Sequence, residues 1–415
     1  MPRSVLLVTQ YAPPSSLVAA RRVAAVTKYL GRAGHAVTVL TSQSSGEGPI
    51  EGAESVVRTK DALTSRLNWR RRHFAALAGG SGESYRPPSR LASVVVPDLS
   101  LLTWLPFALP AALRLARTRR FDCVLTTSPP PSVHLVGLAL RRHGMPWIAE
   151  LRDGWAFEPP HPAWPLAALD RLDRGLERRI LPSADAVIAV TEPIVDDLRR
   201  RYGIDVELIT NGFDPEEVPA EPAEPDPLLD SLRFSLVHTG RLALSGVSLE
   251  RMLEGVRIAK AEDPAVATKL EVVFAGSATA DELRLFTAPD LDGVVRFVGW
   301  LERPRVLALQ RAADALLVVT EGGGRRSVAT GKLFEYLAAG QPILVLGDET
   351  EAARLVARAG AGFAAPASEP RSVAAALRRL LGHPFRPASA DAIREYSYPV
   401  LAGRVAAAIE RVTGG

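Results

Sequence analysis

Short apolar runs alternate with amphipathic segments along most of the chain. Near the N-terminus, the apolar run 4–9 (SVLLVT) precedes a segment, 19–33, whose apolar residues recur at helical spacing, and a second apolar run follows at 36–41. Gly34 comes directly after the helical segment, where a glycine commonly ends a helix. The pattern predicts a strand, a helix and a second strand in that order.

The same alternation continues over the first half of the chain. Apolar runs at 121–127, 147–151 and 186–190 indicate further strands, the last two each preceded by a helical stretch. Strands that are separated by helices pair in parallel, and parallel sheets are covered on both faces. Residues 1–212 are therefore expected to form one α/β domain of the Rossmann-like, doubly wound type.

A proline-rich, acidic stretch then interrupts the pattern. Residues 215–227 (PEEVPAEPAEPDP) contain five prolines and five acidic residues and are unsuited to any core element. We expect an interdomain linker over 213–230. A chain of 415 residues also exceeds what one hydrophobic core usually supports, so two domains are expected on length alone.

The α/β pattern restarts after the linker and predicts a second Rossmann-like domain over 231–395. Two such domains would place a ligand cleft between the carboxyl ends of their sheets. The region 396–415 reads as a C-terminal helix that we expect to pack back on the first domain. The second domain's predicted strands are 234–239, 270–275, 294–298, 315–319 and 342–346, and its predicted helices include 249–261, 303–312 and 332–339.

Composition narrows the class of protein. The single cysteine, Cys123, excludes an internal disulfide, and its apolar surroundings indicate a buried thiol. The run Val5–Val8 is too short for a signal peptide, and the longest apolar stretch, 99–116, is interrupted by Pro106 and Pro110. Seven scattered histidines offer no metal-ligand spacing. These features predict a cytoplasmic protein without a metal site.

Positive charge is concentrated in the first half of the chain. Residues 58–120 carry 12 Lys or Arg against 3 Asp or Glu, interleaved with aromatic residues such as Trp69, Phe74 and Trp104. Such a segment suits an anionic membrane surface, which would place the protein peripherally at the inner face of the membrane. A merely solvated basic face is the alternative. Nucleic acid is not expected as a partner, because no recognition module accompanies the charge.

The clearest motif is the stretch 331–346 (GKLFEYLAAGQPILVL). It predicts an amphipathic helix that stops at Gly340 and leads into a buried strand. Lys332 and Glu335 lie in the first helical turn, where unpaired N–H groups and the helix dipole favour an anion or an acceptor. Taken alone, the motif fits equally a well-capped helix with solvated charges.

This stretch resembles the donor-binding signature of retaining GT-B glycosyltransferases of the family 4-like, group 1 type, in the variant S-K-L-x-E-Y-x-A-x-G-x-P. The resemblance implies that Lys332 contacts the donor diphosphate, that Glu335 binds the ribose hydroxyls, and that Leu333 belongs to the same donor site. The wider family often has a further Glu near the donor sugar, and that position is Ser327 here.

The sequence His238-Thr239-Gly240-Arg241 follows a predicted strand directly. Gly240 would let a ligand approach the backbone, and Arg241 offers a fork of donors to a phosphate. The family has a comparable Gly-Arg followed by a Lys, where this chain has Leu244-Ser245-Gly246. Arg241 and Lys332 would then stabilise the departing diphosphate. On its own, Thr-Gly-Arg is also an ordinary turn.

Two segments of the first domain resemble acceptor-side segments of the same family. The first is the phosphate loop after the first strand, with Pro14, Ser15 and Ser16, followed by Arg21 in the helix. The resemblance implies that this loop approaches the donor phosphate and the acceptor. The second is Glu150-Leu151-Arg152-Asp153-Gly154-Trp155, similar to the family's Arg-Asp-x-Trp segment. In it, Asp153 is the candidate that orients the acceptor hydroxyl or takes its proton, beside Arg152 and Trp155. A structural ion pair between Arg152 and Asp153 is the alternative.

The resemblance implies transfer of a sugar from a nucleotide-diphosphate sugar to an acceptor hydroxyl, with retention and without metal or other cofactor. The acceptor would be a sugar, a lipid-linked sugar or a small molecule, in the synthesis of cell-surface polysaccharide, glycolipid or glycoconjugate. Two alternatives remain: a GT-B sugar-nucleotide epimerase, and a catalytically silent partner that binds nucleotide sugars. The run 360–365 fits G-x-G-x-x-A but follows a helix, so it is not a dinucleotide-binding motif.

Overall fold

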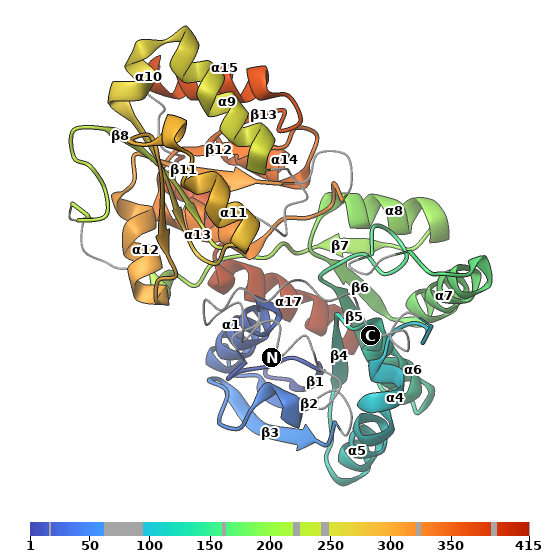
Figure 1. The fold of residues 1–415 in the computed structure, drawn as a ribbon. Helices are drawn as coiled ribbons and strands as arrows, with labels where there is room; N and C mark the ends of the chain where they lie inside the picture. Colours follow the sequence, from blue (N-terminus) through green and yellow to red (C-terminus); the bar gives the residue numbers. More distant parts are fainter. Residues whose placement is uncertain are drawn as a thin grey trace. The chain divides into compact units, whose positions relative to one another are not determined.

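The computed structural model describes residues 1–15, 18–61, 94–159, 163–218, 225–241, 249–320, 325–382 and 388–414. The described residues form two compact units. Figure 1 shows them as a ribbon coloured from the N-terminus to the C-terminus. The first unit contains the residues up to Gly212 together with the C-terminal residues from Ser397 onward. The second unit contains Phe213–Tyr396.

In the part of the chain that the structure describes, the first unit holds a seven-stranded sheet of order β3-β2-β1-β4-β5-β6-β7, in which all neighbouring strands are parallel. The order reverses between β1 and β4, which lie side by side although β2 and β3 separate them in sequence. The strands are β1 (Ser4–Val8), β2 (Ala36–Ser42), β3 (Ala53–Thr59), β4 (Cys123–Ser128), β5 (Trp147–Leu151), β6 (Ala186–Ala189) and β7 (Val206–Leu208).

Both faces of this sheet are covered by helices. Successive side chains of a strand point to opposite faces, so neighbouring residues of one strand join different clusters. In β1, Leu6 and Val8 join one hydrophobic cluster, and Val5 and Leu7 join the other. The first cluster is completed by helices α5, α6 and α8, and the second by α1 and α17. The helices are α1 (Val18–Arg32), α4 (Ser100–Thr103), α5 (Leu105–Thr118), α6 (His134–Arg142), α7 (Ala167–Ile180), α8 (Glu192–Tyr202) and α17 (Tyr398–Thr413).

Helix α17 belongs to the first unit, although it is the last element of the chain. Its buried residues Leu401, Val405 and Ile409 recur every four positions and form one apolar face. That face packs against α1, and the two helices lie side by side in Figure 1. Burial of this face is worth several kcal/mol at about 25 cal/mol per Å², so the C-terminus helps to hold the first unit together.

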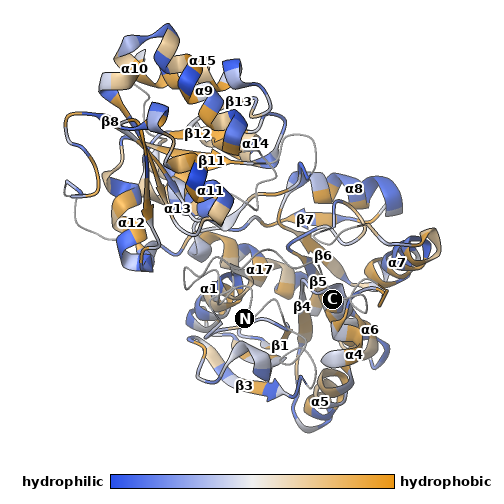
Figure 2. Cartoon of the chain, viewed as in Figure 1, coloured by the Kyte–Doolittle hydropathy of each residue, from blue (hydrophilic) through white to orange (hydrophobic). Residues whose placement is uncertain are grey.

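The described residues of the second unit form a six-stranded parallel sheet of order β10-β9-β8-β11-β12-β13. The order reverses between β8 and β11. Figure 2 shows apolar strands at the centre of each unit and polar outer faces on helices such as α8 and α9. The strands are β8 (Phe234–Thr239), β9 (Leu270–Ala275), β10 (Val295–Gly299), β11 (Ala315–Val319), β12 (Ile343–Leu346) and β13 (Gly362–Ala365).

Helices cover both faces of the second sheet as well. In β8, Leu236 faces the cluster built with α9 and α15, and Val237 faces the cluster built with α13 and α14. The helices are α9 (Leu249–Glu262), α10 (Pro264–Lys269), α11 (Ala280–Phe286), α12 (Arg303–Ala312), α13 (Gly331–Ala339), α14 (Glu351–Ala359), α15 (Pro370–Gly382) and α16 (Ala390–Arg394). The predicted fold class, two doubly wound α/β units, is confirmed.

Some elements differ from those expected. Strands β3 and β7, at the two edges of the first sheet, were not expected, because charged residues interrupt their apolar runs. The apolar stretch 99–116 forms α4 and α5, and no helix among the described residues is long and apolar enough to span a bilayer. Within the predicted linker, Asp226 pairs with Arg305 and so fixes this part of the chain to the second unit.

Candidate functional site

The reversal of strand order in the second unit lies between β8 and β11. Doubly wound sheets bind ligands at such a reversal, beyond the carboxyl ends of the strands. β8 ends at Thr239, and Gly240 follows with φ +99° while its N–H donates to the carbonyl of Ala275 at 2.7 Å. A Cβ atom at position 240 would lie 3.2 Å from Nζ of Lys332. The backbone conformation therefore favours glycine at this position, and a Cβ atom would also press on the amine of Lys332.

The N-terminus of α13 is the second part of this site. The helix begins at Gly331 after Thr330, whose side chain makes no capping hydrogen bond. Its Oγ1 atom is buried and has no partner among the described residues. Helix N-termini attract anions because their first N–H groups lack intrahelical partners. Lys332 lies in the first turn of this helix, as expected. Glu335 was expected in the first turn but lies in the second, because the helix begins at Gly331.

Lys332 contacts a buried histidine of β8. Its Nζ atom lies 3.3 Å from Nε2 of His238, whose Nδ1 atom lies 2.8 Å from the carbonyl oxygen of Leu317. Since a carbonyl only accepts, Nδ1 carries the proton and Nε2 accepts from Lys332. Burial lowers the pKa of Lys332 to about 8, against the opposing effect of Glu335. Burial and the charge of Lys332 place the pKa of His238 well below its ordinary value, so this imidazole is neutral.

Glu335 is held by an arginine from the neighbouring helix. Nη1 of Arg303, at the start of α12, lies 2.9 Å from Oε1 of Glu335, and the same guanidinium pairs with Glu217. Burial opposes the charged form of Arg303, but the two carboxylates raise its pKa above the ordinary value. The Glu335 side chain is only 14% exposed, so this contact occurs at low dielectric and fixes the carboxylate.

Arg241 extends from the turn after β8. Its Nη1 atom is buried and has no hydrogen-bond partner among the described residues. Burial lowers the pKa of Arg241, while Glu282 acts in the opposite direction. A buried guanidinium nitrogen without a partner is costly, and an incoming phosphate oxygen would satisfy it.

Two other residues of this helix are structural. Leu333 is fully buried in the core beneath the sheet, so only its backbone is available to a donor. The hydroxyl of Tyr336 accepts the N–H of Thr239 at 2.8 Å and contacts Thr239 Oγ1 at 3.2 Å. Gln310 also donates to Thr239 Oγ1, at 2.8 Å. These contacts fix the end of β8, and with it the position of Gly240.

The first unit places a buried ion pair near its own strand reversal, between β1 and β4. Arg22 lies 2.8 Å from Oε1 of Glu150 and also donates to the carbonyls of Ile209 and Thr210. Thr127 donates its hydroxyl to the other oxygen of Glu150 at 2.5 Å. Burial opposes both charges, but the partners raise the pKa of Arg22 and lower that of Glu150. The pair is therefore ionised and joins α1 and β5 to the segment that follows β7.

The predicted acceptor segment continues from β5. Arg152 is buried, and its guanidinium donates to the carbonyls of Ser128 at 2.8 Å and of Ala19. Asp153, half-buried, follows it. Trp155 is almost fully buried, and its indole N–H donates to Asp173 at 2.8 Å. Arg152 and Trp155 thus fix the backbone on both sides of Asp153.

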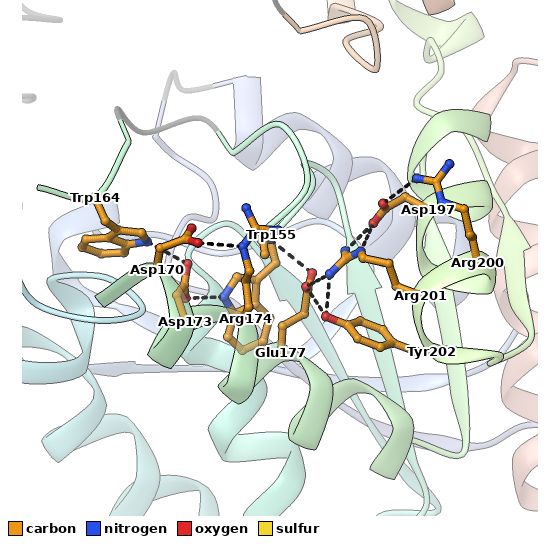
Figure 3. A network of polar contacts seen from close by, with 11 residues as sticks. Trp155, Trp164, Asp170, Asp173, Arg174, Glu177, Asp197, Arg200, Arg201 and Tyr202 are labelled. Atoms are coloured by element: carbon orange, nitrogen blue, oxygen red, sulfur yellow. Dashed lines mark hydrogen bonds and ion pairs between the residues drawn. The ribbon is translucent and has the colours of Figure 1, made fainter. Parts of the chain in front are cut away.

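A polar network between α7 and α8 continues this support (Figure 3). Glu177 accepts the N–H of Ala156 at 3.2 Å, and its other oxygen accepts from Arg201 and from the hydroxyl of Tyr202, both at 2.6 Å. Trp164 donates to Asp173 at 3.0 Å, beside Trp155. Buried carboxylates with this many donors make a rigid structure, and the segment after Asp153 is attached to it.

The predicted phosphate loop is described only in part. Ser16 lies outside the described residues. Ser15 donates its N–H to the carbonyl of Ala12 at 3.1 Å, which forms a turn through Pro14. Arg21 is exposed on α1, whereas its neighbour Arg22 is buried.

The charged segment 58–120 is also described in part, since residues 62–93 lie outside the described ranges. In the described portion, Leu102 and Phe107 are 51% and 37% exposed on α4 and α5. Arg114 and Arg117 near the end of α5, and Arg119 and Arg120 just beyond it, are exposed as well.

The remaining expectations concern metal ligands and the single thiol. Within the described ranges, no group of three or more His, Cys, Asp or Glu side chains is arranged to hold a metal ion. Cys123 is buried, as expected, and burial raises the pKa of its thiol to about 12. A thiol with so high a pKa stays protonated at neutral pH and is a poor nucleophile.

Four residues of these sites were given no role from the sequence: Arg22, Glu150, His238 and Arg303. Arg22 and Arg21 are adjacent, and only the packing of α1 decides which faces the core. His238 stands at the start of the His-Thr-Gly-Arg motif, but only Gly240 and Arg241 of that motif were given a role. Arg303 meets Glu335 through the packing of α12 on α13, which no local sequence pattern encodes.

Comparisons with known proteins indicate the class to which this fold belongs. Residues 19–217 match the family model of Glycosyltransferase Family 4, and residues 233–383 match the model of Glycosyl transferases group 1. No curated protein matches the sequence. The fold and these matches define the chain as a transferase with the GT-B fold. The first match lies mostly within the first unit, and the second match lies within the second unit.

Solved structures with the same fold cover almost the whole chain. Sucrose-phosphate synthase from Thermosynechococcus elongatus is 17% identical, with a TM-score of 0.67, and 99% of each chain is covered. HepE from Anabaena, solved in complex with UDP, is 16% identical with a TM-score of 0.65, over 99% of this chain and 100% of that one. WaaG, a glycosyltransferase involved in lipopolysaccharide biosynthesis, is 16% identical with a TM-score of 0.61, over the same shares.

Proposed function

We propose that the chain transfers a sugar from a nucleotide-diphosphate sugar to an acceptor hydroxyl, and that the second unit holds the donor. The observation that carries the proposal is the meeting of Lys332, on the N-terminus of α13, with Gly240 at the strand reversal. A diphosphate at this position would receive charge from Lys332 and Arg241, and a ribose would meet Glu335. The presence of UDP in the HepE structure makes UDP-sugars the first donors to test.

In this proposal the chain's own cations drive the departure of the nucleoside diphosphate. Lys332 and the Arg241 guanidinium would stabilise the negative charge that develops on the leaving diphosphate. With both groups present, no divalent cation is needed. Turnover is therefore expected to continue in excess EDTA, and NMR of the product is expected to show the donor's anomeric configuration retained.

On the acceptor side, we propose that Asp153 orients the acceptor hydroxyl or takes its proton. Arg152 and Trp155 hold the segment in place through the contacts described above. The phosphate loop, with Pro14, Ser15, Ser16 and Arg21, is the companion element on this side. Asp153→Asn is expected to lower kcat at least about 100-fold, the lower range for general acid–base catalysis, while the affinity for the donor stays unchanged.

We further propose a sugar or lipid-linked acceptor, in the synthesis of cell-surface polysaccharide, glycolipid or glycoconjugate at the cytoplasmic face of a membrane. The exposed apolar residues of α4 and α5, and the arginines at the end of α5, would contact anionic headgroups. Neutralising Arg114, Arg117, Arg119 and Arg120 should abolish co-sedimentation with vesicles rich in phosphatidylglycerol. The matched control neutralises four exposed arginines of α7 and α8 and should retain binding; these are Arg174, Arg178, Arg199 and Arg200.

The central test is calorimetric titration of UDP, GDP and dTDP into the wild-type chain and into Glu335→Ala. One nucleotide should bind, and the variant should bind it at least tenfold more weakly. Unchanged binding would falsify the donor-site assignment. Release of free nucleoside diphosphate only when an acceptor is present distinguishes the transferase from an epimerase and from a silent binding partner.

A further inference from the structure

Arg303 contacts two carboxylates at once, from two different parts of the second unit. Its Nη1 atom lies 2.9 Å from Oε1 of Glu335, and its Nη2 atom pairs with Glu217. Glu335 belongs to α13, and Glu217 belongs to the short turn Pro215–Glu217, which follows the point where the chain enters this unit. A guanidinium presents five N–H donors in a fixed fork, so both contacts can be made together.

The three side chains differ in their exposure to solvent. Glu335 is 14% exposed, Arg303 34%, and Glu217 50%. The Arg303–Glu335 contact is therefore the more desolvated of the two and the stronger, whereas an exposed pair such as Arg303–Glu217 is weakened by solvent. The difference indicates that Arg303 acts on Glu335, and that Glu217 holds the arginine in place.

A carboxylate has two oxygens and about four lone pairs, so the contact of Arg303 with Oε1 does not exhaust its capacity to accept. A ribose diol offers two hydroxyl donors on adjacent carbons. Without Arg303, the Glu335 side chain would lose a contact that restricts its rotamer and would have to be ordered further when a nucleotide binds. The entropy lost in that ordering would weaken nucleotide binding.

We propose that Arg303 is a positioning residue for the nucleotide: it presents the Glu335 carboxylate to the ribose, and Glu217 keeps Arg303 oriented for this task. The inference rests on the donor site proposed above. It goes beyond that site because it extends recognition of the ribose to a residue of α12 and to the segment by which the chain enters the second unit. Neither residue touches the reacting atoms.

The experiment compares Arg303→Ala and Arg303→Lys with the wild-type chain, by calorimetric titration of two probes. The first is whichever of the ribonucleotides UDP and GDP binds the wild type more tightly, since dTDP lacks the 2′-hydroxyl, and the second is inorganic pyrophosphate, which has no ribose. Arg303→Ala should lower the affinity for the nucleotide about tenfold and leave the affinity for pyrophosphate unchanged. Arg303→Lys keeps the charge but loses the fork of donors, and should recover part of the affinity.

The matched control is Arg305→Ala, two residues further along α12. Arg305 pairs with Asp226 rather than with Glu335, so its loss perturbs the same helix without releasing the Glu335 carboxylate. Its nucleotide affinity should stay within about twofold of the wild type. Glu217→Gln should lower nucleotide affinity by a smaller factor than Arg303→Ala, about threefold, and again leave pyrophosphate unaffected.

A double-variant cycle separates positioning from general damage to the fold. If Arg303 acts through Glu335, the Arg303→Ala change should cost no further nucleotide affinity once Glu335 is already alanine. Equal losses for nucleotide and pyrophosphate, or losses that add fully in the double variant, overturn the inference while the donor site stands. Undiminished nucleotide binding by Glu335→Ala alone overturns the donor site, and the inference with it.

Discussion

Nζ of Lys332 lies 3.3 Å from Nε2 of His238, and the other ring nitrogen of the histidine donates to the carbonyl of Leu317. The imidazole is buried and neutral, so its Nε2 atom is a fixed acceptor that holds the lysine amine near the end of β8. The same burial lowers the pKa of Lys332 to about 8. The residue proposed to meet the diphosphate therefore titrates close to physiological pH.

We predict that nucleoside diphosphate binding weakens as the pH rises above about 8. A bound diphosphate favours the charged lysine and raises its pKa, so the complex holds a proton that the free protein has lost at high pH. Below about pH 8 the lysine is charged in both states and affinity should be nearly flat with respect to this group. Titration calorimetry from neutral to clearly alkaline pH, in buffers of different ionisation enthalpy, should detect proton uptake only at the upper end.

Lys332→Arg provides the control for this pH dependence. An arginine stays charged throughout the range, so binding should become independent of pH on the alkaline side. A wild-type affinity that remains constant well above the pKa of Lys332 would contradict both that pKa and the role given to the lysine.

We predict that Gly240→Ala weakens nucleotide binding by about three- to tenfold. The positive φ of this residue makes alanine unfavourable by roughly 1–2 kcal/mol. The added Cβ would also lie 3.2 Å from Nζ of Lys332, which is tighter than an ordinary contact, so the amine would have to shift slightly. Gly293→Ala is the matched control, since Gly293 has φ +74° and a Cβ added there would meet no atom within 4 Å. It should lose similar stability but no affinity, and equal affinity losses in both variants would argue against a contact at Gly240.

We predict that Glu150→Gln destabilises the protein by about 3–5 kcal/mol, because it leaves the Arg22 guanidinium buried without a carboxylate. Since the folded-state pKa of Glu150 is lowered, its stabilising contribution is present above the unfolded pKa and is lost as the pH falls through the folded one. Urea unfolding at neutral and at acidic pH measures both effects. The double change Arg22→Met with Glu150→Gln should cost less than the sum of the single changes.

We predict that Tyr336→Phe costs about 1–3 kcal/mol of stability. The hydroxyl accepts the N–H of Thr239 at 2.8 Å, and its removal leaves that buried donor without the partner it has in the folded protein. Chemical denaturation measures the loss. Nucleotide affinity should also fall modestly, because the end of β8 and Gly240 become less ordered, and a variant as stable as the wild type would contradict this account.

The elements of the two sheets could be predicted from the sequence wherever strands lie at the centre. Runs such as Leu236–Val237 and Leu316–Val318 are apolar on both sides because both faces of a central strand are covered. Edge strands such as β3 and β7 lack this signal, since one side of each has no neighbouring strand. Among the site residues, Lys332 and Glu335 are marked by a local motif on a single helix.

The sequence by itself determined that the chain forms two α/β units, that residues 331–346 form a helix followed by a buried strand, and that Lys332 and Glu335 lie in the N-terminal half of that helix. Local periodicity and helix-end chemistry act over a few residues, so they can be read along the chain. Tertiary structure alone decided that α17 packs on α1, that His238 meets Lys332, and that Arg303 holds Glu335. These contacts join residues that are distant in sequence, and they depend on how helices and strands pack, which no local pattern records.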